Sequence, residues 1–328
     1  MVEAKHWTVL DAGKVRCDLC PHHCTLSGGQ AGICMGRVNE NGKLYSSNFG
    51  QVVSASLDPI EKKPLYHFFP GSLIFSVGPN GCNFRCPYCQ NWEISQRETH
   101  TSFVPPHELV RNAGRDGSVG IAYTYAEPLI WYEYVLECSK LAREAGLVNV
   151  LVTNGFIEKA PLAELLPLID ALNIDVKSVR EEFYKKLCKA SLEPVLRTCE
   201  TAKKVCHVEI TNLLIPGENT GKEDVTELVR WIASKLGKDT PLHFSRYFPH
   251  YKFAAEATTE STLFTAYEIG KKELFYCYVG NVRSANGANT YCPKCGNMLV
   301  ERAGYSIRIA GIEDRKCSRC GRNADFVL

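Results

Sequence analysis

Three cysteines in the middle of the chain, Cys82, Cys86 and Cys89, follow one another as C-x3-C-x2-C in the sequence GCNFRCPYC. Three thiolates within eight residues can hold one metal centre. A structural zinc site needs four ligands, and no fourth ligand is nearby in the sequence. A [4Fe–4S] cluster held by three cysteines keeps one iron free for another ligand. The spacing therefore favours a catalytic iron–sulfur cluster, with a zinc site that borrows a remote fourth ligand as the alternative.

Two C-x2-C pairs near the other end of the sequence, each followed by glycine, comprise Cys292, Cys295, Cys317 and Cys320. This arrangement is typical of a zinc ribbon, in which four thiolates saturate a tetrahedral Zn2+ ion and the site is structural. The metal would supply folding free energy to a segment too short for a core of its own. An iron site with the same four thiolates is the alternative.

A third group has the spacing C-x2-C-x3-C-x9-C and comprises Cys17, Cys20, Cys24 and Cys34. Four thiolates again close a coordination shell, so our first expectation is Zn2+. A second [4Fe–4S] cluster also takes four thiolates and could relay electrons, which redox-inert zinc cannot do. His22 and His23 lie in the same segment and could replace a cysteine, although exposed loop histidines are the simpler interpretation.

Between the outer cysteine groups, short apolar strands alternate with amphipathic helices. We expect strands at 72–77, 119–125, 148–154, 171–177, 208–217, 241–245 and 274–280, and helices at 106–115, 129–145, 159–169, 191–204, 222–237 and 259–272. Such alternation predicts βαβ units and a parallel sheet. About six repeats fit either an open doubly wound sheet or a partial barrel. In both folds, functional residues are expected at the C-terminal ends of the strands.

The spacing of the central cysteines, with Tyr88 before the last one, resembles the radical S-adenosylmethionine (SAM) superfamily. The resemblance implies a [4Fe–4S] cluster whose free iron binds the amino and carboxylate groups of SAM. An electron from the cluster would cleave the C5′–S bond and release a 5′-deoxyadenosyl radical, which abstracts a hydrogen atom from a substrate. An external donor of the flavodoxin or ferredoxin type would supply that electron.

Further positions match that superfamily one by one, at the C-terminal ends of the expected strands. Glu127, in TYAEP, stands where relatives hold the methionyl amino group with a GGE-type motif, and here Tyr125 and Ala126 replace the glycines. Lys177 would suit the SAM carboxylate. The other SAM contacts that the resemblance implies are Tyr88, Thr153, Asn154, Asp175, Pro216, Gly280 and Asn281. A simple turn at 153–155 and a plain ion pair between residues 175 and 177 are the alternatives.

Longer blocks narrow the resemblance. DPIEKKPLYHFFPGS and CQNWEISQ look like the pyruvate formate-lyase activating-enzyme branch, and RCDLCPHHCTLSGGQAGICMGR, PLHFSRYFPHYK and NTYCPKCG are similar to the AmmeMemoRadiSam-system radical enzyme. The resemblance covers nearly the whole chain. It implies an α/β fold with a (β/α)6 partial TIM barrel at 61–280, a four-cysteine module at 1–60 and a zinc ribbon at 281–328. The other proteins of that system are the partners it suggests, and the substrate stays open.

Polar residues on the inner faces of two expected strands form another group. Glu209 and Thr211 share one face of the strand at 208–217, and His243 and Ser245 share one face of the next strand. Because parallel strands are normally apolar on both faces, these side chains indicate an interior cavity. Arg246 follows at the mouth and could hold an anionic group. Our candidates for catalysis are therefore Glu209, His243 and Arg246, and a buried hydrogen-bond network is the alternative.

Three basic residues, Lys62, Lys63 and His67, precede the first expected strand and could line the pocket or be solvated. The substrate would be a small molecule or a protein. A glycyl radical protein, as for the activating enzymes, predicts an open barrel mouth. A small polar molecule predicts a mouth covered by residues 1–60 or 281–328.

Composition limits the other classes of function. The 328 residues carry 38 Lys and Arg against 36 Asp and Glu, a net charge of +2. A zinc-containing nucleic-acid-binding or RNA-modifying protein needs a basic face, and the near-neutral charge argues against it. No apolar run is long enough to cross a membrane, and no signal peptide is visible, so we expect a cytoplasmic protein. In a reducing compartment, sixteen cysteines point to metals or redox chemistry.

Overall fold

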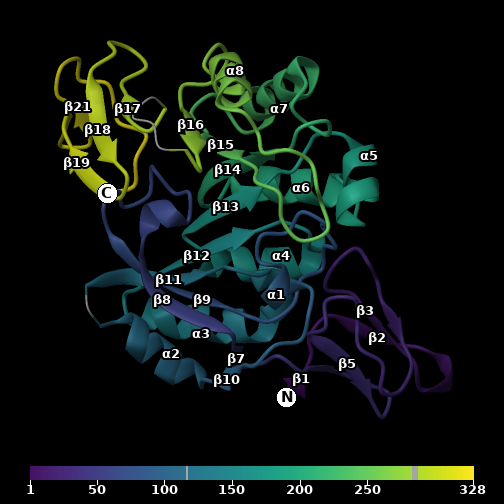
Figure 1. The fold of residues 1–328 in the computed structure, drawn as a ribbon. Coiled ribbons are helices and arrows are strands. Elements are labelled where there is room, and N and C mark those ends of the chain that lie inside the picture. Colours follow the sequence, from purple (N-terminus) through teal and green to yellow (C-terminus); the bar gives the residue numbers. More distant parts are fainter. Residues whose placement is uncertain (116, 283–286) are drawn as a thin grey trace.

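A computed structural model of the chain describes residues 1–115, 117–282 and 287–328 (Figure 1). An eight-stranded sheet lies at its centre, in the spatial order β16-β15-β14-β13-β12-β11-β9-β8. All neighbours pair in parallel except β8, which runs antiparallel to β9. The strands are β8 (Ser54–Pro59), β9 (Leu73–Gly78), β11 (Ser118–Tyr123), β12 (Val148–Thr153), β13 (Ala171–Asp175), β14 (His207–Leu214), β15 (Leu242–Arg246) and β16 (Cys277–Gly280).

Helices connect the parallel strands and cover the outer face of the sheet (Figure 1). In α7 the buried residues recur at helical spacing, which places one apolar stripe against the sheet: Val225, Leu228, Val229 and Ile232. The helices are α1 (Trp92–Ser95), α2 (Pro106–Ala113), α3 (Tyr132–Glu144), α4 (Lys159–Leu165), α5 (Glu181–Phe183), α6 (Glu193–Ala202), α7 (Lys222–Lys235) and α8 (Glu260–Gly270), with short 3-10 or π turns at 11–13, 60–62, 128–131, 166–168 and 184–188.

The order of the parallel strands decides between the two folds that the sequence allows. From β9 to β16, spatial order follows chain order without a reversal. A doubly wound sheet needs a reversal, because its crossovers run in both directions. Crossovers that all run one way, with the usual right-handed connection, keep the helices on one face and curl the sheet around the other. The expected α/β partial barrel with six β–α repeats is therefore confirmed.

Residues 60–69 form a plug that fills the lower interior of this barrel, on the side of the strand N-termini. Its apolar residues Ile60, Leu65 and Phe68 are buried in one cluster with the inward residues of four strands, which are Ile74, Ala122, Val150 and Ala171. The plug follows β8 directly. The interior of the barrel is thus divided into a filled lower part and an upper part at the C-terminal ends of the strands.

The N-terminal segment packs beside the barrel as two small three-stranded sheets (Figure 1). Its buried Cys17, Leu19 and Leu26 join the main hydrophobic core. A Cβ atom on Gly81 would lie 2.2 Å from the carbonyl oxygen of Cys34, so this segment lies directly against the loop after β9. The strands are β1 (Val2–Glu3), β2 (Trp7–Val9), β3 (Val15–Cys17), β4 (Thr25–Leu26), β5 (Arg37–Glu40) and β6 (Lys43–Ser46), followed by β7 (Gln51–Val52), which pairs with β10 (Ser102–Phe103).

The C-terminal segment, residues 287–328, lies beside β16 (Figure 1). It also contacts the plug through two backbone hydrogen bonds of 2.8 Å. The Val327 N–H donates to the His67 carbonyl oxygen, and the Phe69 N–H donates to the Val327 carbonyl oxygen. The segment therefore joins the last strand of the barrel to the plug. Its strands are β17 (Thr290–Tyr291), β18 (Met298–Ala303), β19 (Ser306–Ile309), β20 (Ile312–Glu313) and β21 (Lys316–Cys317). Within the described residues, no helix combines the length and apolarity that a bilayer crossing requires.

Candidate active site

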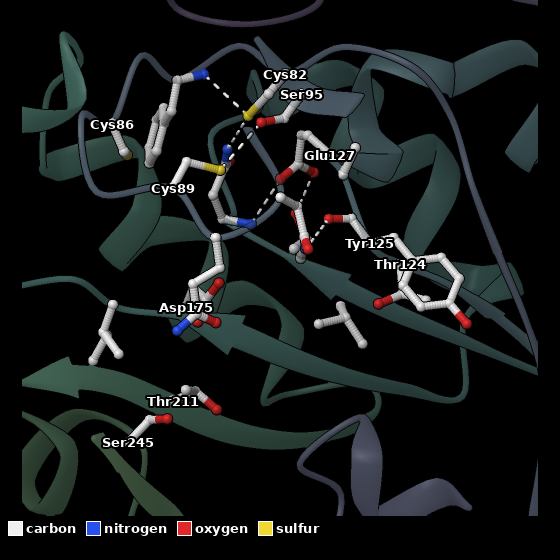
Figure 2. Close-up of a pocket in the computed structure, with 18 of the residues that line it drawn as sticks. Cys82, Cys86, Cys89, Ser95, Thr124, Tyr125, Glu127, Asp175, Thr211 and Ser245 are labelled. Carbon is white, nitrogen blue, oxygen red and sulfur yellow. Dashed lines mark hydrogen bonds between the residues drawn. The ribbon is translucent and has the colours of Figure 1, made fainter. Parts of the chain in front are cut away.

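A cavity of about 800 Å³ opens at the C-terminal ends of the parallel strands, above the plug (Figure 2). Its wall includes the three central cysteines and polar residues from the ends of five strands. This is the position at which a parallel α/β fold carries its ligand sites. Most of the SAM-site residues expected from the resemblance line it, namely Cys82, Cys86, Cys89, Tyr88, Glu127, Thr153, Asn154, Asp175, Lys177 and Asn281.

The three cysteines stand on the loop that follows β9. The backbone N–H of Phe84 points to the Cys82 Sγ at 3.3 Å, and the Ser95 hydroxyl lies 3.1 Å from the Cys89 Sγ. Gly81, with φ +107°, makes the close turn into the loop. Burial raises the pKa of the Cys82 and Cys89 thiols, and these two polar contacts act in the opposite direction. The loop therefore presents three thiols, two of them with hydrogen-bond partners, to one wall of the cavity.

Side chains from two neighbouring elements fasten this loop. Asn83 Nδ2 donates to the carbonyl oxygen of Phe156 at 2.9 Å. His22, from the N-terminal segment, donates its ring N–H to the Asn83 carbonyl oxygen at 2.7 Å. The backbone N–H of Lys252 donates to the carbonyl of Pro87 at 2.9 Å. The cysteine loop is thus fixed from the barrel, from the N-terminal segment and from the loop after β15.

Glu127 is buried at the end of β11, beside the cysteines (Figure 2). Its Oε1 accepts hydrogen bonds from the Thr153 hydroxyl at 2.6 Å and from the Leu129 N–H at 3.0 Å, and its Oε2 accepts from the Asn154 N–H at 2.8 Å. Burial raises the pKa of Glu127 to about 7, although these hydrogen bonds act in the opposite direction. The carboxyl group is therefore fixed in position and titrates near neutral pH.

Asp175 and Lys177 lie on the same face of the chain at the end of β13. Lys177 Nζ is 2.8 Å from Asp175 Oδ2, and the Lys177 backbone N–H donates to the Tyr184 hydroxyl at 3.0 Å. Burial acts against the ammonium charge, but the Asp175 carboxylate holds the pKa of Lys177 above its ordinary value. The pair therefore presents an ammonium group of fixed position to the cavity.

Two expected SAM contacts, Pro216 and Gly280, are absent from the cavity wall in the described part of the chain, whereas their neighbour Asn281 lines it. Asn281 Nδ2 donates to the Ser245 hydroxyl at 3.0 Å. Tyr88 also lines the cavity, and its hydroxyl lies 3.6 Å from the Cys188 sulfur. Among the expected SAM contacts Tyr88, Pro216, Gly280 and Asn281, it is thus Tyr88 and Asn281 that reach the cavity.

The three expected catalytic residues are not brought to the cavity wall formed by the described residues. Glu209 is fully buried and accepts four hydrogen bonds, from the backbone N–H groups of Tyr66 and His67 and from the rings of His207 and His243, at 2.6–3.0 Å. Although burial opposes its charge, the hydrogen bonds from the two histidines hold the pKa of Glu209 well below its usual range. The alternative of a buried network is the one that this geometry favours.

Arg246, the third of these residues, makes other contacts. Its Nε donates to the carbonyl oxygen of Thr258 at 2.7 Å, and its guanidinium lies 3.6 Å from the Glu260 carboxylate. The inner strand faces nevertheless reach the cavity two residues further along, where Thr211 and Ser245 line the wall. The structure therefore agrees with the expectation that these strand faces point inward. It differs in which residues lie at the level of the cavity, because Glu209 and His243 lie two residues nearer the N-terminal ends of their strands.

One part of the wall has no counterpart in the expected strands. Ser54, Ser56 and Asp58 alternate along β8 and line the cavity, and Lys62 and Lys63 follow from the plug. Tyr125, which the sequence singled out only as a replaced glycine, also lines it. Polar residues that alternate with Ala55 and Leu57 were the signal for this strand, but the run has no β-branched or aromatic residue of the kind that marks a strand in sequence.

The four C-terminal cysteines converge. Their sulfur atoms all lie within 4.8 Å of one another, and the pairs Cys292–Cys320 and Cys295–Cys317 are both 3.6 Å apart. Four sulfurs about 2.3 Å from one tetrahedral ion would be roughly 3.8 Å apart. No other group of metal-ligating side chains among the described residues is as tight, and Cys17, Cys20, Cys24 and Cys34 are all described.

Comparison with known proteins places the chain. Residues 77–232 match the family described as the radical SAM superfamily. An uncharacterized protein of Methanocaldococcus jannaschii is 46% identical over the whole of both chains. The pyruvate formate-lyase-activating enzyme of Clostridium pasteurianum is 26% identical over 46% of this chain and 66% of its own length.

A solved structure shares the fold. The crystal structure of a radical SAM methyltransferase from Sphaerobacter thermophilus covers 70% of this chain and 71% of its own, with a TM-score of 0.51 and 16% identity. The matched superfamily implies a [4Fe–4S] cluster and SAM, and three thiolates on the wall of a large polar cavity fit both groups. The chain belongs to the radical SAM superfamily and is an enzyme of that class.

Proposed function

We propose that the enzyme cleaves SAM reductively in the cavity above the plug and removes a hydrogen atom from a small polar molecule bound in the same cavity. One observation carries the choice of substrate size. The cavity of about 800 Å³ holds the three cysteines and also a charged wall of β8 and the plug. Small-molecule sites span roughly 300–1,000 Å³, so this cavity lies toward the upper end of that range and gives space for a second small molecule beside the cluster and SAM.

The cluster and SAM supply the following chemistry when bound: one electron from an external flavodoxin- or ferredoxin-like donor breaks the C5′–S bond of SAM, which yields methionine and a 5′-deoxyadenosyl radical, and this radical takes a hydrogen atom from the substrate. The thiolates of Cys82, Cys86 and Cys89 would hold three irons of the cluster. The Phe84 N–H and the Ser95 hydroxyl, at 3.3 and 3.1 Å from two of the sulfurs, support their negative charge.

Glu127 would accept the methionyl ammonium group of SAM. Thr153 and Asn154 act in this proposal by holding that carboxylate, because their hydroxyl and N–H already donate to it. Lys177, oriented by Asp175, would bind the SAM carboxylate. Tyr88 and Asn281 would contact the adenine, and Pro216 and Gly280 would act only through their neighbours.

Glu209 and His243 would be positioning residues. The Glu209 carboxylate holds two backbone N–H groups of the plug, so it fixes the floor of the cavity. Arg246 would hold the loop after β15 through Thr258. None of the three then needs to touch the substrate.

A second candidate is activation of a glycyl radical protein. The similarity to a pyruvate formate-lyase-activating enzyme supports it. That activity needs a protein segment to enter the cavity from outside. The charged wall of β8 and the plug, which lies within the cavity, favours the small molecule instead.

We further propose Zn2+ for the C-terminal cysteines, because the 3.6 Å sulfur pairs suit one tetrahedral ion. For the N-terminal four cysteines, Zn2+ and a second [4Fe–4S] cluster both stay open. The resemblance to the AmmeMemoRadiSam-system enzyme supports the other proteins of that system as partners, and sixteen free cysteines support a cytoplasmic location.

The test uses protein purified without oxygen. Iron, sulfide and zinc are measured per chain, and dithionite and SAM are added to detect 5′-deoxyadenosine. We expect the wild type and the matched Cys138→Ala variant, which changes a buried cysteine outside the three groups, to form the nucleoside. Cys82→Ala should form none. Nucleoside from Cys82→Ala, or none from the reconstituted wild type, contradicts the proposal.

A further inference from the structure

The cavity has two ends of opposite charge. Of the residues that the structure describes, six charged side chains line it, and they are Glu127, Asp175, Lys177, Asp58, Lys62 and Lys63. The first three lie toward the cysteines and carry a net charge of −1, which suits the sulfonium and ammonium groups of SAM. The other three come from β8 and the plug and carry a net charge of +1. The proposed function uses the first end and leaves the second without a ligand.

At the second end, two lysines share one carboxylate. Lys62 Nζ is 3.0 Å from Asp58 Oδ1, and Lys63 Nζ is 2.8 Å from Asp58 Oδ2. Although burial opposes its charge, hydrogen bonds from Lys63, Tyr125 and Lys62 hold the pKa of Asp58 well below its usual range. One carboxylate can balance only one ammonium, so the group keeps one positive charge. The Lys62 side chain is 44% exposed, whereas that of Lys63 is 3% exposed, so Lys62 can turn to a ligand.

Tyr125 completes this group at a conformational cost. Its backbone has φ +67°, a region that non-glycine residues rarely adopt. Its hydroxyl donates to Asp58 Oδ2 at 2.7 Å, and Lys63 Nζ lies 4.6 Å from the centre of its ring. Asn91 Nδ2 donates to the Tyr125 carbonyl oxygen and holds this conformation. Unfavourable backbone conformations that are held in this way are concentrated at ligand sites.

The group also lies at a useful position relative to the cysteines. Tyr125 stands two residues before Glu127, and Figure 2 shows its ring on the side of Glu127 away from Cys82, Cys86 and Cys89. Ser54 and Ser56 precede Asp58 on the same face of β8 and line the same wall. A molecule held here would reach toward the SAM end from the opposite side and would find hydroxyl donors beside the lysines.

We propose that Asp58, Lys62, Lys63 and Tyr125 form an anion subsite that binds a carboxylate or phosphate group of the substrate. This inference rests on the proposed function, in which the substrate shares the cavity with SAM. The substrate is then a small molecule with an oxyanion at one end and the reacting C–H bond at the other. Charge-assisted hydrogen bonds from Lys62 would hold the oxyanion, with Lys63 and Tyr125 fixing the charge behind it.

Calorimetric titration of the cluster-containing enzyme with SAM bound tests this subsite. The probes are inorganic phosphate and malonate, added separately at low ionic strength. We expect saturable binding of at least one probe to the wild type. Lys62→Gln should weaken it about tenfold, since one charge-assisted hydrogen bond is lost. Binding of phosphate alone identifies a phosphoryl group, and binding of malonate alone identifies a carboxylate.

Matched variants separate charge from general damage. Lys62→Arg keeps the charge and should keep the binding. Lys271→Gln changes a half-exposed lysine directly after α8, outside the cavity, and should bind like the wild type. Equal binding by the wild type and Lys62→Gln, or no binding of either probe, overturns the subsite. The proposed function is tested by a separate measurement, because SAM cleavage by the wild type requires neither phosphate nor malonate.

Discussion

The central cysteines and the C-terminal cysteines differ in how many sulfur atoms meet and in what those atoms face. Three sulfurs stand on the wall of a large cavity at the centre. Four sulfurs lie within 4.8 Å of one another in the C-terminal segment. Four thiolates saturate a tetrahedral ion and leave no position for a ligand, whereas three leave one iron of a cluster open. In our proposal, the same ligand type thus serves chemistry in one region and stability in the other.

The two regions also differ in how they are held. The cysteine loop is fixed by hydrogen bonds to the barrel and to the N-terminal segment, and it adjoins the main core. The C-terminal segment has only a small cluster of its own buried residues, and two of them are cysteines: Cys292, Leu299, Val300 and Cys317. The loop should therefore keep its fold without a metal, and the segment should not.

The largest effect that sharpens this contrast is expected from Cys86→Ala. Loss of one thiolate should remove the cluster and lower 5′-deoxyadenosine formation by at least about 1,000-fold, since the electron from the external donor is expected to reach SAM through this cluster. Thermal unfolding should shift by only a few degrees. Chromatography of the products and iron analysis check the first part. Retained iron together with retained turnover would remove the contrast.

The next largest effect is expected from Cys317→Ser, which should lower the stability of the C-terminal segment and leave the central cysteines intact. Three ligands should no longer hold Zn2+ tightly, and residues 287–328 should lose several kcal/mol of local stability. Hydrogen exchange over this segment and zinc analysis measure the change. Ser318→Ala alters the neighbouring residue and should leave both unchanged. Iron content should also stay unchanged, and joint loss of iron and zinc would show that the two regions are not independent.

Acid should release the C-terminal segment from the plug. Burial lowers the pKa of His67 from 6.5 to about 3. His67 Nδ1–H donates to the Asp325 carbonyl oxygen, and its Nε2 accepts from the Tyr278 hydroxyl, so the docked ring is neutral. Between these pKa values the released state binds a proton that the docked state does not, so docking strengthens as pH rises and is lost as pH falls from 6.5 toward 3.

We expect the docking of residues 287–328 on the plug to lose about 3 kcal/mol of free energy by pH 4, since each unit of pKa difference corresponds to about 1.4 kcal/mol. Limited proteolysis of residues 287–328 against pH gives the midpoint. His67→Gln has no ionisable ring and should lose this pH dependence. A profile that is the same in both proteins would assign the acid sensitivity to another group.

The smallest effect concerns the central region. Because burial raises the pKa of Glu127 to about 7, the carboxylate is protonated increasingly as pH falls below that value. A protonated carboxyl cannot balance the SAM ammonium, so SAM binding should weaken up to tenfold per pH unit below about 7. Binding by Glu127→Gln should be weaker and flat with pH. Glu108→Gln, an exposed residue on α2, is the matched control and should follow the wild type.

Sequence reasoning predicted the parallel strands and the three cysteine groups, because apolar runs and C-x2-C spacings are local patterns. It missed β8, since Ser54, Ser56 and Asp58 give the strand a polar inner face. It expected Glu209 and His243 in a cavity that Thr211 and Ser245 reach instead. Alternation along a strand shows which face of the sheet a side chain lies on, but it does not show how far along the barrel axis that side chain lies. Two residues along a strand correspond to about 7 Å. The plug, which is remote in sequence from both strands, decides that depth.

The bond between His67 and Asp325 joins residues 258 positions apart, and this has a consequence for biosynthesis. At about 5–20 residues per second, the ribosome needs roughly 10–50 s to travel between them. The apolar partners of Leu65 and Phe68 lie at residues 74–171, so the plug can enter the nascent barrel early. Its outer side then waits for residues 287–328. During that interval the most recently made strand of the growing sheet, and finally β16, has an unpaired edge, which is the kind of surface that chaperones protect.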